Sequence, residues 1–149
     1  MKPDPVQTRR PQVLVVDDEP GLRAMLEWEL SDRGMDVQAA KDGQEAAEMV
    51  EKRPFDIVVT DLTMPRTDGL MLLEGLKKTN PEIHVIIATG FGTVEIAVHA
   101  MQKGAFDFML KPVDLEDLVS RIRKALSCSA AHCTCQAHQT HFSKDKQPA

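Results

Sequence analysis

The sequence predicts an α/β fold in which five parallel strands form one doubly wound sheet with helices on both faces. Short runs rich in Val and Ile are apolar on consecutive residues, as in strands that are buried on both faces. Segments with apolar residues at helical spacing separate these runs. The two kinds of segment alternate strictly along the chain, and this order favours parallel strands joined by crossover helices.

In the first half of the chain we expect three strands and two helices. The strands are residues 13–16 (VLVV), 36–40 (DVQAA) and 56–60 (DIVVT). Pro20 suits the first turn of a helix, and Gly34 and Gly43 suit turns or element ends. The apolar residues at helical spacing are Leu22, Met25, Leu26 and Leu30 in the first helix and Ala46, Ala47 and Val50 in the second.

In the second half we expect two strands and three helices. The strands are residues 84–89 (HVIIAT) and 106–110 (FDFML). Gly104 suits an element end, and Asp114 suits the N-cap of the last helix. The apolar residues at helical spacing are Leu70, Leu73 and Leu76; then Val94, Ala97, Val98 and Met101; then Leu115, Leu118, Val119, Ile122 and Leu126.

Composition and charge narrow the class of protein. A chain of 149 residues with 42% apolar content is long enough for one domain with its own core. The formal net charge of -5 and the pI near 5.5 argue against direct binding to nucleic acid or to an anionic membrane. The sequence also lacks an apolar run of membrane-spanning length and a secretory signal, so we expect a cytoplasmic protein.

Polar residues stand where the expected strands end. Asp17 and Asp18 end the first strand, Asp61 ends the third, Thr89 ends the fourth and Lys111 follows the fifth. Ligands of open parallel sheets bind beyond the carboxyl ends of the strands, where the winding reverses. With the strand order 2-1-3-4-5, the first and third strands are neighbours at this point, so the three carboxylates should meet in one crevice.

Three clustered carboxylates need a positive partner, because each disfavours the ionisation of the next. Mg²⁺ prefers oxygen ligands and is commonly held by one or two carboxylates and phosphate oxygens. We expect Asp18 and Asp61 to bind the metal directly and Asp17 to act through water. A carboxylate can attack phosphorus to form an acyl phosphate, which makes Asp61 the expected nucleophile. The ammonium of Lys111 supplies a movable positive charge.

Four stretches resemble the receiver domain of two-component response regulators. They are VLVVDDEP, DIVVTDLTMPRTDG, IIATGFG and GAFDFMLKP, and they stand in the order and spacing of that family over residues 12–126. The resemblance implies a flavodoxin-like (βα)5 fold. It also implies that Asp61 is the phosphoacceptor of a sensor histidine kinase or a histidine phosphotransfer protein, and that the backbone carbonyl of Thr63 helps to bind Mg²⁺. Such a domain is not an enzyme in the usual sense, since it carries out only its own phosphorylation and dephosphorylation.

The same resemblance implies how phosphorylation would be signalled. Thr89 would bond to a phosphoryl oxygen and Phe108 would turn inward, so that the surface of the fourth helix, fifth strand and fifth helix changes. Homodimerisation on phosphorylation and an unidentified downstream target are compatible with this scheme. The Lys111–Pro112 peptide matches the cis position of the family. Kinases of the family dock beside the start of the first helix, near Leu22 and Met25.

The ends of the chain fall outside the resemblance. Residues 1–11 form an N-terminal extension and residues 127–149 a tail that we expect to be disordered, because it has few large apolar residues and no helical period. Within the receiver-like region, the segment GTVEIAVHAMQKGAFDF resembles the receivers of nitrogen-regulation-class transcription activators. Soft ligands for zinc or copper gather in the tail, although the spacing fits no standard zinc finger. They are Cys128, His132, Cys133 and Cys135, with His138 and His141 further along.

Two other functions remain open from the sequence. One is a receiver-like adaptor that is not phosphorylated and signals by docking, with a metal-binding or redox-sensitive tail. This adaptor would have no need of the complete set of acids, Thr89 and Lys111. The other is a phosphatase of the haloacid dehalogenase type, which requires a second acid two residues after the nucleophile. Thr63 stands at that position, so this activity is disfavoured.

Overall fold

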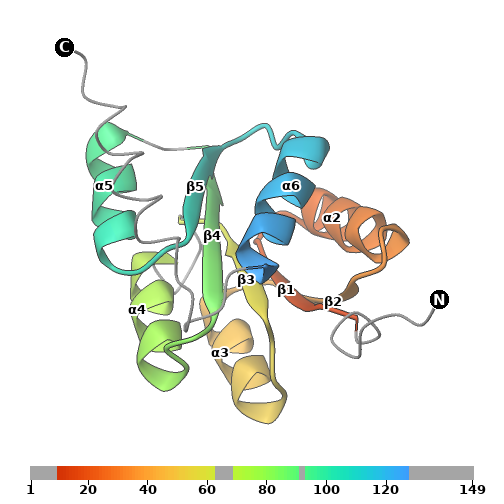
Figure 1. Cartoon of the computed structure of the whole chain (residues 1–149), viewed down its shortest axis with the longest axis horizontal. Helices are drawn as coiled ribbons and strands as arrows, with labels where there is room; N and C mark the ends of the chain where they lie inside the picture. The colour runs from red at the N-terminus through yellow and green to blue at the C-terminus, as the bar shows by residue number, and fades with distance from the viewer. Residues whose placement is uncertain (1–9, 63–68, 91–92, 128–149) are drawn as a thin grey trace.

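One parallel sheet organises the protein, with its strands in the order β2-β1-β3-β4-β5 (Figure 1). The computed structural model describes residues 10–62, 69–90 and 93–127. The fold class and the strand order predicted from the sequence are confirmed. The strands are β1 (Gln12–Val16), β2 (Asp36–Ala40), β3 (Ile57–Thr60), β4 (His84–Thr89) and β5 (Asp107–Leu110).

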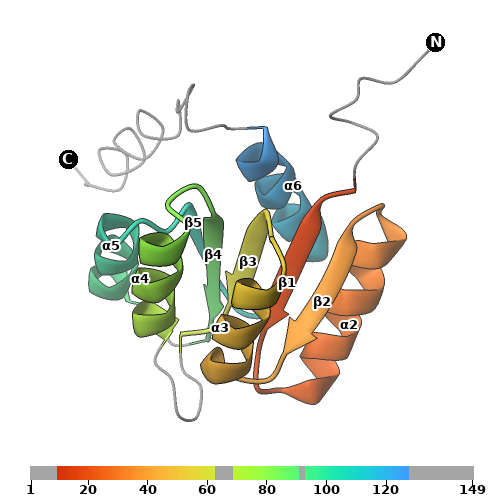
Figure 2. The ribbon, with the colours of Figure 1, turned by 90° about the horizontal axis from the view of Figure 1, so that it is seen from below.

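In the part of the chain that the structure describes, five helices cover the two faces of the sheet: α2 and α6 lie on one face, and α3, α4 and α5 lie on the other (Figure 2). No helix within residues 10–62, 69–90 and 93–127 is both long and apolar enough to cross a bilayer. The helices are α2 (Pro20–Asp32), α3 (Gly43–Lys52), α4 (Gly69–Thr79), α5 (Val94–Gln102) and α6 (Leu115–Leu126).

The sheet separates two apolar layers. Along β1, Val13 and Val15 pack in the layer beneath α2 and α6, whereas Leu14 and Val16 pack in the layer beneath α3, α4 and α5. Successive side chains of a strand point to opposite faces, so a strand covered on both sides is apolar at every position. This arrangement explains the continuous apolar run VLVV, all of whose members are buried.

Turn and cap residues fix where several helices begin and end. Pro20 occupies the first turn of α2, as predicted. The Asp114 carboxylate accepts a hydrogen bond from the Asp117 backbone N–H and caps α6, which was also predicted. Gly34 and Gly104 have positive φ angles of 91° and 108°, so both turns depend on a residue without a Cβ atom.

The side of α5 that faces the core is not the side that the apolar spacing of the sequence predicts. Ala100 is fully buried, and Ile96 and Met101 pack against the core, whereas Val94 and Val98 are 74% and 46% exposed. Apolar residues occur around most of this short helix, so their spacing alone does not select one face. Packing against the sheet decides the orientation and leaves two valines in solvent.

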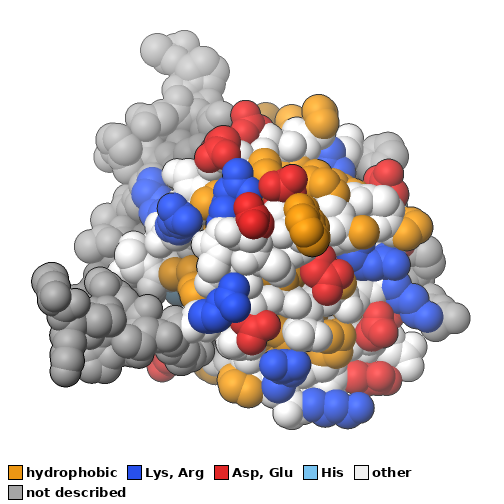
Figure 3. All heavy atoms as spheres, turned by 90° about the vertical axis from the view of Figure 1, so that its right-hand side faces the viewer, with side chains coloured by type: hydrophobic (Ala, Val, Ile, Leu, Met, Phe, Trp, Pro, Cys, Tyr) orange, Lys and Arg blue, Asp and Glu red, His pale blue; other side chains and the backbone are white. Residues whose placement is uncertain are grey.

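Apolar side chains also reach the surface along α2. The face drawn in Figure 3, which is the right-hand side of Figure 1, shows apolar side chains interspersed with acidic and basic ones. On α2, Trp28, which stands off the apolar stripe, is 72% exposed, and Met25 is 38% exposed although it fits that stripe. Leu26 and Leu30 carry most of the burial of this helix.

We predict that Leu30→Ala lowers the free energy of unfolding by about 2–5 kcal/mol, because it leaves a cavity in a closed core. Leu30 is fully buried beneath α2. Trp28→Ala, on the same helix, should change it by no more than about 0.5 kcal/mol, because this side chain is mostly in solvent. Urea denaturation of the two variants measures both effects, and equal losses would contradict the assigned orientation of α2.

Candidate functional site

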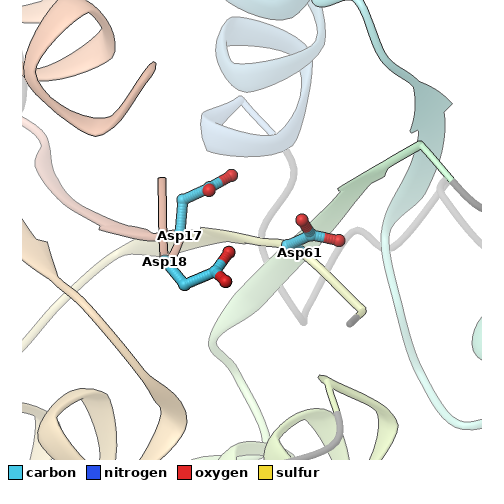
Figure 4. Close-up of side chains that lie close together, drawn as sticks. All are labelled: Asp17, Asp18 and Asp61. Atoms are coloured by element: carbon cyan, nitrogen blue, oxygen red, sulfur yellow. The ribbon is translucent and has the colours of Figure 1, made fainter. Parts of the chain in front are cut away.

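Three carboxylates from two adjacent strands meet at the carboxyl edge of the sheet (Figure 4). Asp17 and Asp18 follow β1 and Asp61 follows β3, whose last residues pair in the register Val16 to Thr60. Carboxylate oxygens of the three lie within 4.8 Å of one another. Asp17 and Asp61 are 3% and 8% exposed, whereas Asp18 faces solvent. We call these three residues the acidic cluster.

Lys111 provides the positive charge within this cluster. Its ammonium Nζ lies 2.7 Å from Asp17 Oδ2 and 2.8 Å from Asp61 Oδ2. The Lys111 backbone N–H donates to the Thr89 carbonyl at 2.9 Å, and the Lys111–Pro112 peptide is cis. Burial lowers the pKa of Lys111, but the hydrogen bonds and charges of Asp17 and Asp61 outweigh it and raise the pKa above its ordinary value.

Asp17 is bound through its backbone as well as its side chain. Its N–H donates to the Ala40 carbonyl at 3.1 Å, and its Oδ1 accepts the Glu19 backbone N–H at 2.9 Å. Arg23 on α2 donates from Nη1 to the Asp17 carbonyl oxygen at 2.8 Å. These contacts, together with Lys111, fix the segment that leaves β1 and enters α2.

Gly69 at the start of α4 lies directly against the backbone of Asp61. Its N–H donates to the Leu62 carbonyl at 2.8 Å. A Cβ atom added at Gly69 would lie 2.4 Å from the Asp61 carbonyl oxygen and 2.6 Å from the Leu62 Cα, which is closer than packed atoms approach. The glycine of the motif DIVVTDLTMPRTDG therefore allows α4 to begin beside the third carboxylate.

Thr89 and Phe108 lie on the strands next to this cluster. Thr89 is fully buried at the end of β4. Phe108 is half-buried on β5, pairs with Ile87 of β4 and packs toward the layer of α3, α4 and α5. Their predicted switching roles stay predictions. Thr63 and the tail candidates Cys128, His132, Cys133 and Cys135 lie outside the described residues.

The residues of the acidic cluster fit a magnesium ion. All three donors are carboxylates, the ligand type that a hard divalent cation prefers, and the solvent-facing Asp18 leaves room for water ligands. A small cavity of about 10 Å³ lies beside Asp17 and Asp61, and the apolar side chains of Leu22 and Val113 help to line it.

The sequence did not identify Arg23 and Glu19 as parts of the site. Both act on Asp17 through backbone atoms, Arg23 by donating to its carbonyl and Glu19 by donating its own N–H. Contacts through backbone atoms do not require side chains of opposite charge, so the sequence shows no charge pair that would indicate them. A basic residue one turn into the helix that follows the acid pair was the available signal.

The chain is similar to known proteins over most of its length. The family model described as response regulator receiver domain matches residues 13–123. The response regulator protein PilR of Pseudomonas aeruginosa is 38% identical over 117 residues, which are 78% of this chain and 26% of PilR. The DNA-binding transcriptional regulator NtrC of Escherichia coli is 33% identical over 136 residues. The chain spans about a quarter of the length of these curated relatives.

Solved structures show the same fold. The receiver domain of NtrX from Brucella abortus has a TM-score of 0.73 and 37% identity, with 77% of this chain and 98% of that chain covered. The beryllofluoride-activated NtrC4 receiver domain, solved as a dimer, has a TM-score of 0.75 and 35% identity, with 78% of this chain and 96% of that chain covered. Each of the two alignments covers nearly all of the solved domain.

We predict opposite effects for two glycine substitutions in α4. Gly69→Ala should lower the free energy of unfolding by about 1–3 kcal/mol, because the new methyl group pushes on the Asp61 backbone. Gly75→Ala should raise it by up to about 1 kcal/mol, because Gly75 is exposed and has open space around it. Urea denaturation measures both values. A Gly69→Ala variant as stable as Gly75→Ala would refute the close approach.

We also predict that the stabilisation from Lys111 is lost at high pH. Its pKa is raised in the folded state, so the stabilisation is complete below the unfolded value of about 10.4 and declines as pH rises through the folded value. The difference in unfolding free energy between the wild type and Lys111→Met, followed in urea from pH 7 to pH 11.5, should be constant and then shrink. Lys52→Met, on the outside of α3, is the control. A gap that widens above pH 10.5 would contradict the paired ammonium.

Proposed function

The chain belongs to the response regulator receiver family, and from this premise we propose that it is a phosphoacceptor domain of a two-component system. Asp61 would receive the phosphoryl group from a phosphohistidine on a sensor histidine kinase or a histidine phosphotransfer protein. The observation that carries this proposal is the Lys111 ammonium held between the carboxylates of Asp17 and Asp61.

The contacts of Asp61 suit phosphoryl transfer. A carboxylate oxygen of Asp61 would attack phosphorus, the phosphorus–nitrogen bond to the donor histidine would break, and an acyl phosphate would form. Catalysis of such a step consists mainly of positioning and charge stabilisation. Lys111 already lies 2.8 Å from Asp61 Oδ2, so its ammonium is close enough to follow the charge onto the phosphoryl oxygens.

Magnesium is the cofactor that the acidic cluster fits. Asp18 and Asp61 would bind it directly and Asp17 through a water molecule, with the Thr63 carbonyl, outside the described residues, as a further ligand. When bound, the ion supplies positive charge that offsets the carboxylates and the incoming phosphoryl group. Asp17 already engages Lys111 and Glu19 through its two oxygens, which supports the indirect role assigned to it.

We assign no turnover of external substrates to the domain, since the proposed chemistry is confined to its own Asp61. The donor would approach the solvent-facing Asp18, beside the start of α2. Met25, 38% exposed on that helix, lies on the surface that a docking kinase would contact. Leu22 is half-buried against the core, so its share in such a contact would be smaller.

Phosphorylation would be signalled at the surface formed by α5, β5 and α6. Thr89 and Phe108 would carry the change from Asp61 to this surface. Three exposed apolar residues support its use as a contact surface: Val94 and Val98 on α5 and Leu110 on β5. The activated NtrC4 receiver domain was solved as a dimer, and a homodimer through this surface is the corresponding proposal for this chain.

Acetyl phosphate tests the proposal directly. With Mg²⁺, the wild type should incorporate one phosphoryl group, and intact-protein mass spectrometry should detect it. Asp61→Asn should incorporate none, because the amide lacks the nucleophilic carboxylate. Asp36→Asn, at the opposite end of the sheet, should be labelled like the wild type. A wild-type chain that takes up no phosphate, or an Asp61→Asn variant that does, would contradict the proposal.

A further inference from the structure

We propose that Arg23 is a positioning residue for the metal site. By binding the Asp17 carbonyl oxygen, it fixes the peptide group between Asp17 and Asp18 and so directs the Asp18 carboxylate toward Asp61. This inference rests on the proposed function, because it concerns the readiness of the acidic cluster to bind Mg²⁺. It assigns a role to a residue that does not belong to the cluster itself.

The position of Arg23 suits this role. Its Nη1 lies 2.8 Å from the Asp17 carbonyl oxygen in a partly buried contact. Its own backbone N–H donates to the Glu19 carbonyl at 3.0 Å in the first turn of α2. Arg23 therefore holds the segment from Asp17 to Glu19 through both its side chain and its backbone. The helix anchors the guanidinium, which in turn anchors the loop.

The peptide after Asp17 needs such an anchor. Val16 is the last residue of β1 in the register with β2 and β3, so the Asp17 carbonyl lies beyond that register. The side chain of Asp17 is held separately, by the Glu19 N–H and by Lys111. Rotation of the peptide after Asp17 would change the direction in which the next side chain leaves the backbone. That side chain is Asp18, the exposed member of the acidic cluster.

Positioning and simple charge balance predict opposite results for Arg23→Gln. A guanidinium that only balanced the carboxylates would compete with a cation, so its removal would strengthen Mg²⁺ binding. A guanidinium that orients the loop prepares the ligands, so its removal would weaken binding. Groups that orient metal ligands typically contribute about 10- to 100-fold to metal affinity. The sign of the change distinguishes the two roles.

The first test is a Mg²⁺ titration of the full chain followed by backbone amide NMR signals. Arg23→Gln should bind Mg²⁺ about tenfold more weakly than the wild type. Arg23→Lys, which keeps the charge and one donating nitrogen, should recover part of the loss. Arg33→Gln is the matched control, because Arg33 lies at the other end of α2 and pairs with Glu29 and Glu116. Its affinity should equal that of the wild type.

The second test uses metal-free protein. The Glu19 N–H is bonded to Asp17 Oδ1. It should exchange with solvent deuterium about fivefold faster in Arg23→Gln than in the wild type, because the loop loses the hydrogen bond from Arg23 to the Asp17 carbonyl. The Glu45 N–H, held in the same manner by Asp42 Oδ1 at the start of α3, should keep its rate. It is an internal control within each sample.

The outcomes separate this inference from the proposed function. A wild type without any response to Mg²⁺ would overturn the proposed metal site and the inference with it. A wild type that binds Mg²⁺, together with an Arg23→Gln variant that binds it equally or more tightly, would overturn only the inference, whatever the exchange rates. Weaker binding with unchanged Glu19 exchange would also overturn it, because the loss would not come from the loop.

Discussion

The contact of the Lys111 ammonium with Asp17 and Asp61 is the interaction on which the carboxyl edge of the sheet depends. Two carboxylates there are almost wholly buried, and buried like charges are costly without a positive partner. Lys111 provides it through hydrogen bonds to both carboxylates. Because the three residues follow β1, β3 and β5, the same contact links strands that do not all pair with one another.

Much of the fold was predictable because its local signals agree with one another. Strands buried on both faces are apolar throughout, the intervening segments carry helical spacing, and the strand-end acids locate the functional edge. The face of α5 was not predictable, since Val94 and Val98 are as apolar as Ile96. In that helix the choice of face is made by packing against the sheet, which periodicity does not describe.

The candidate site divides in the same way. Its charged groups could be predicted from the sequence, because residues that end adjacent parallel strands lie at the same edge of the sheet, as Asp17 and Asp61 do. Its backbone contacts could not be predicted. The hydrogen bond of Arg23 to the Asp17 carbonyl depends on how the chain turns from β1 into α2, and the close approach of Gly69 to the Asp61 main chain depends on where α4 begins. Side-chain chemistry therefore marks the location of the site, and backbone contacts determine how accurately it is held.

The shallow attachment of α5 has a mechanical consequence. Ala100 is its one fully buried residue among those described, whereas α6 buries four, including Leu118 and Ile122. Tilting or sliding α5 thus exposes little new apolar area and costs less free energy than moving α6. Since α5 and α6 precede and follow β5, a displacement at this edge of the sheet costs less apolar burial when α5 moves than when α6 moves.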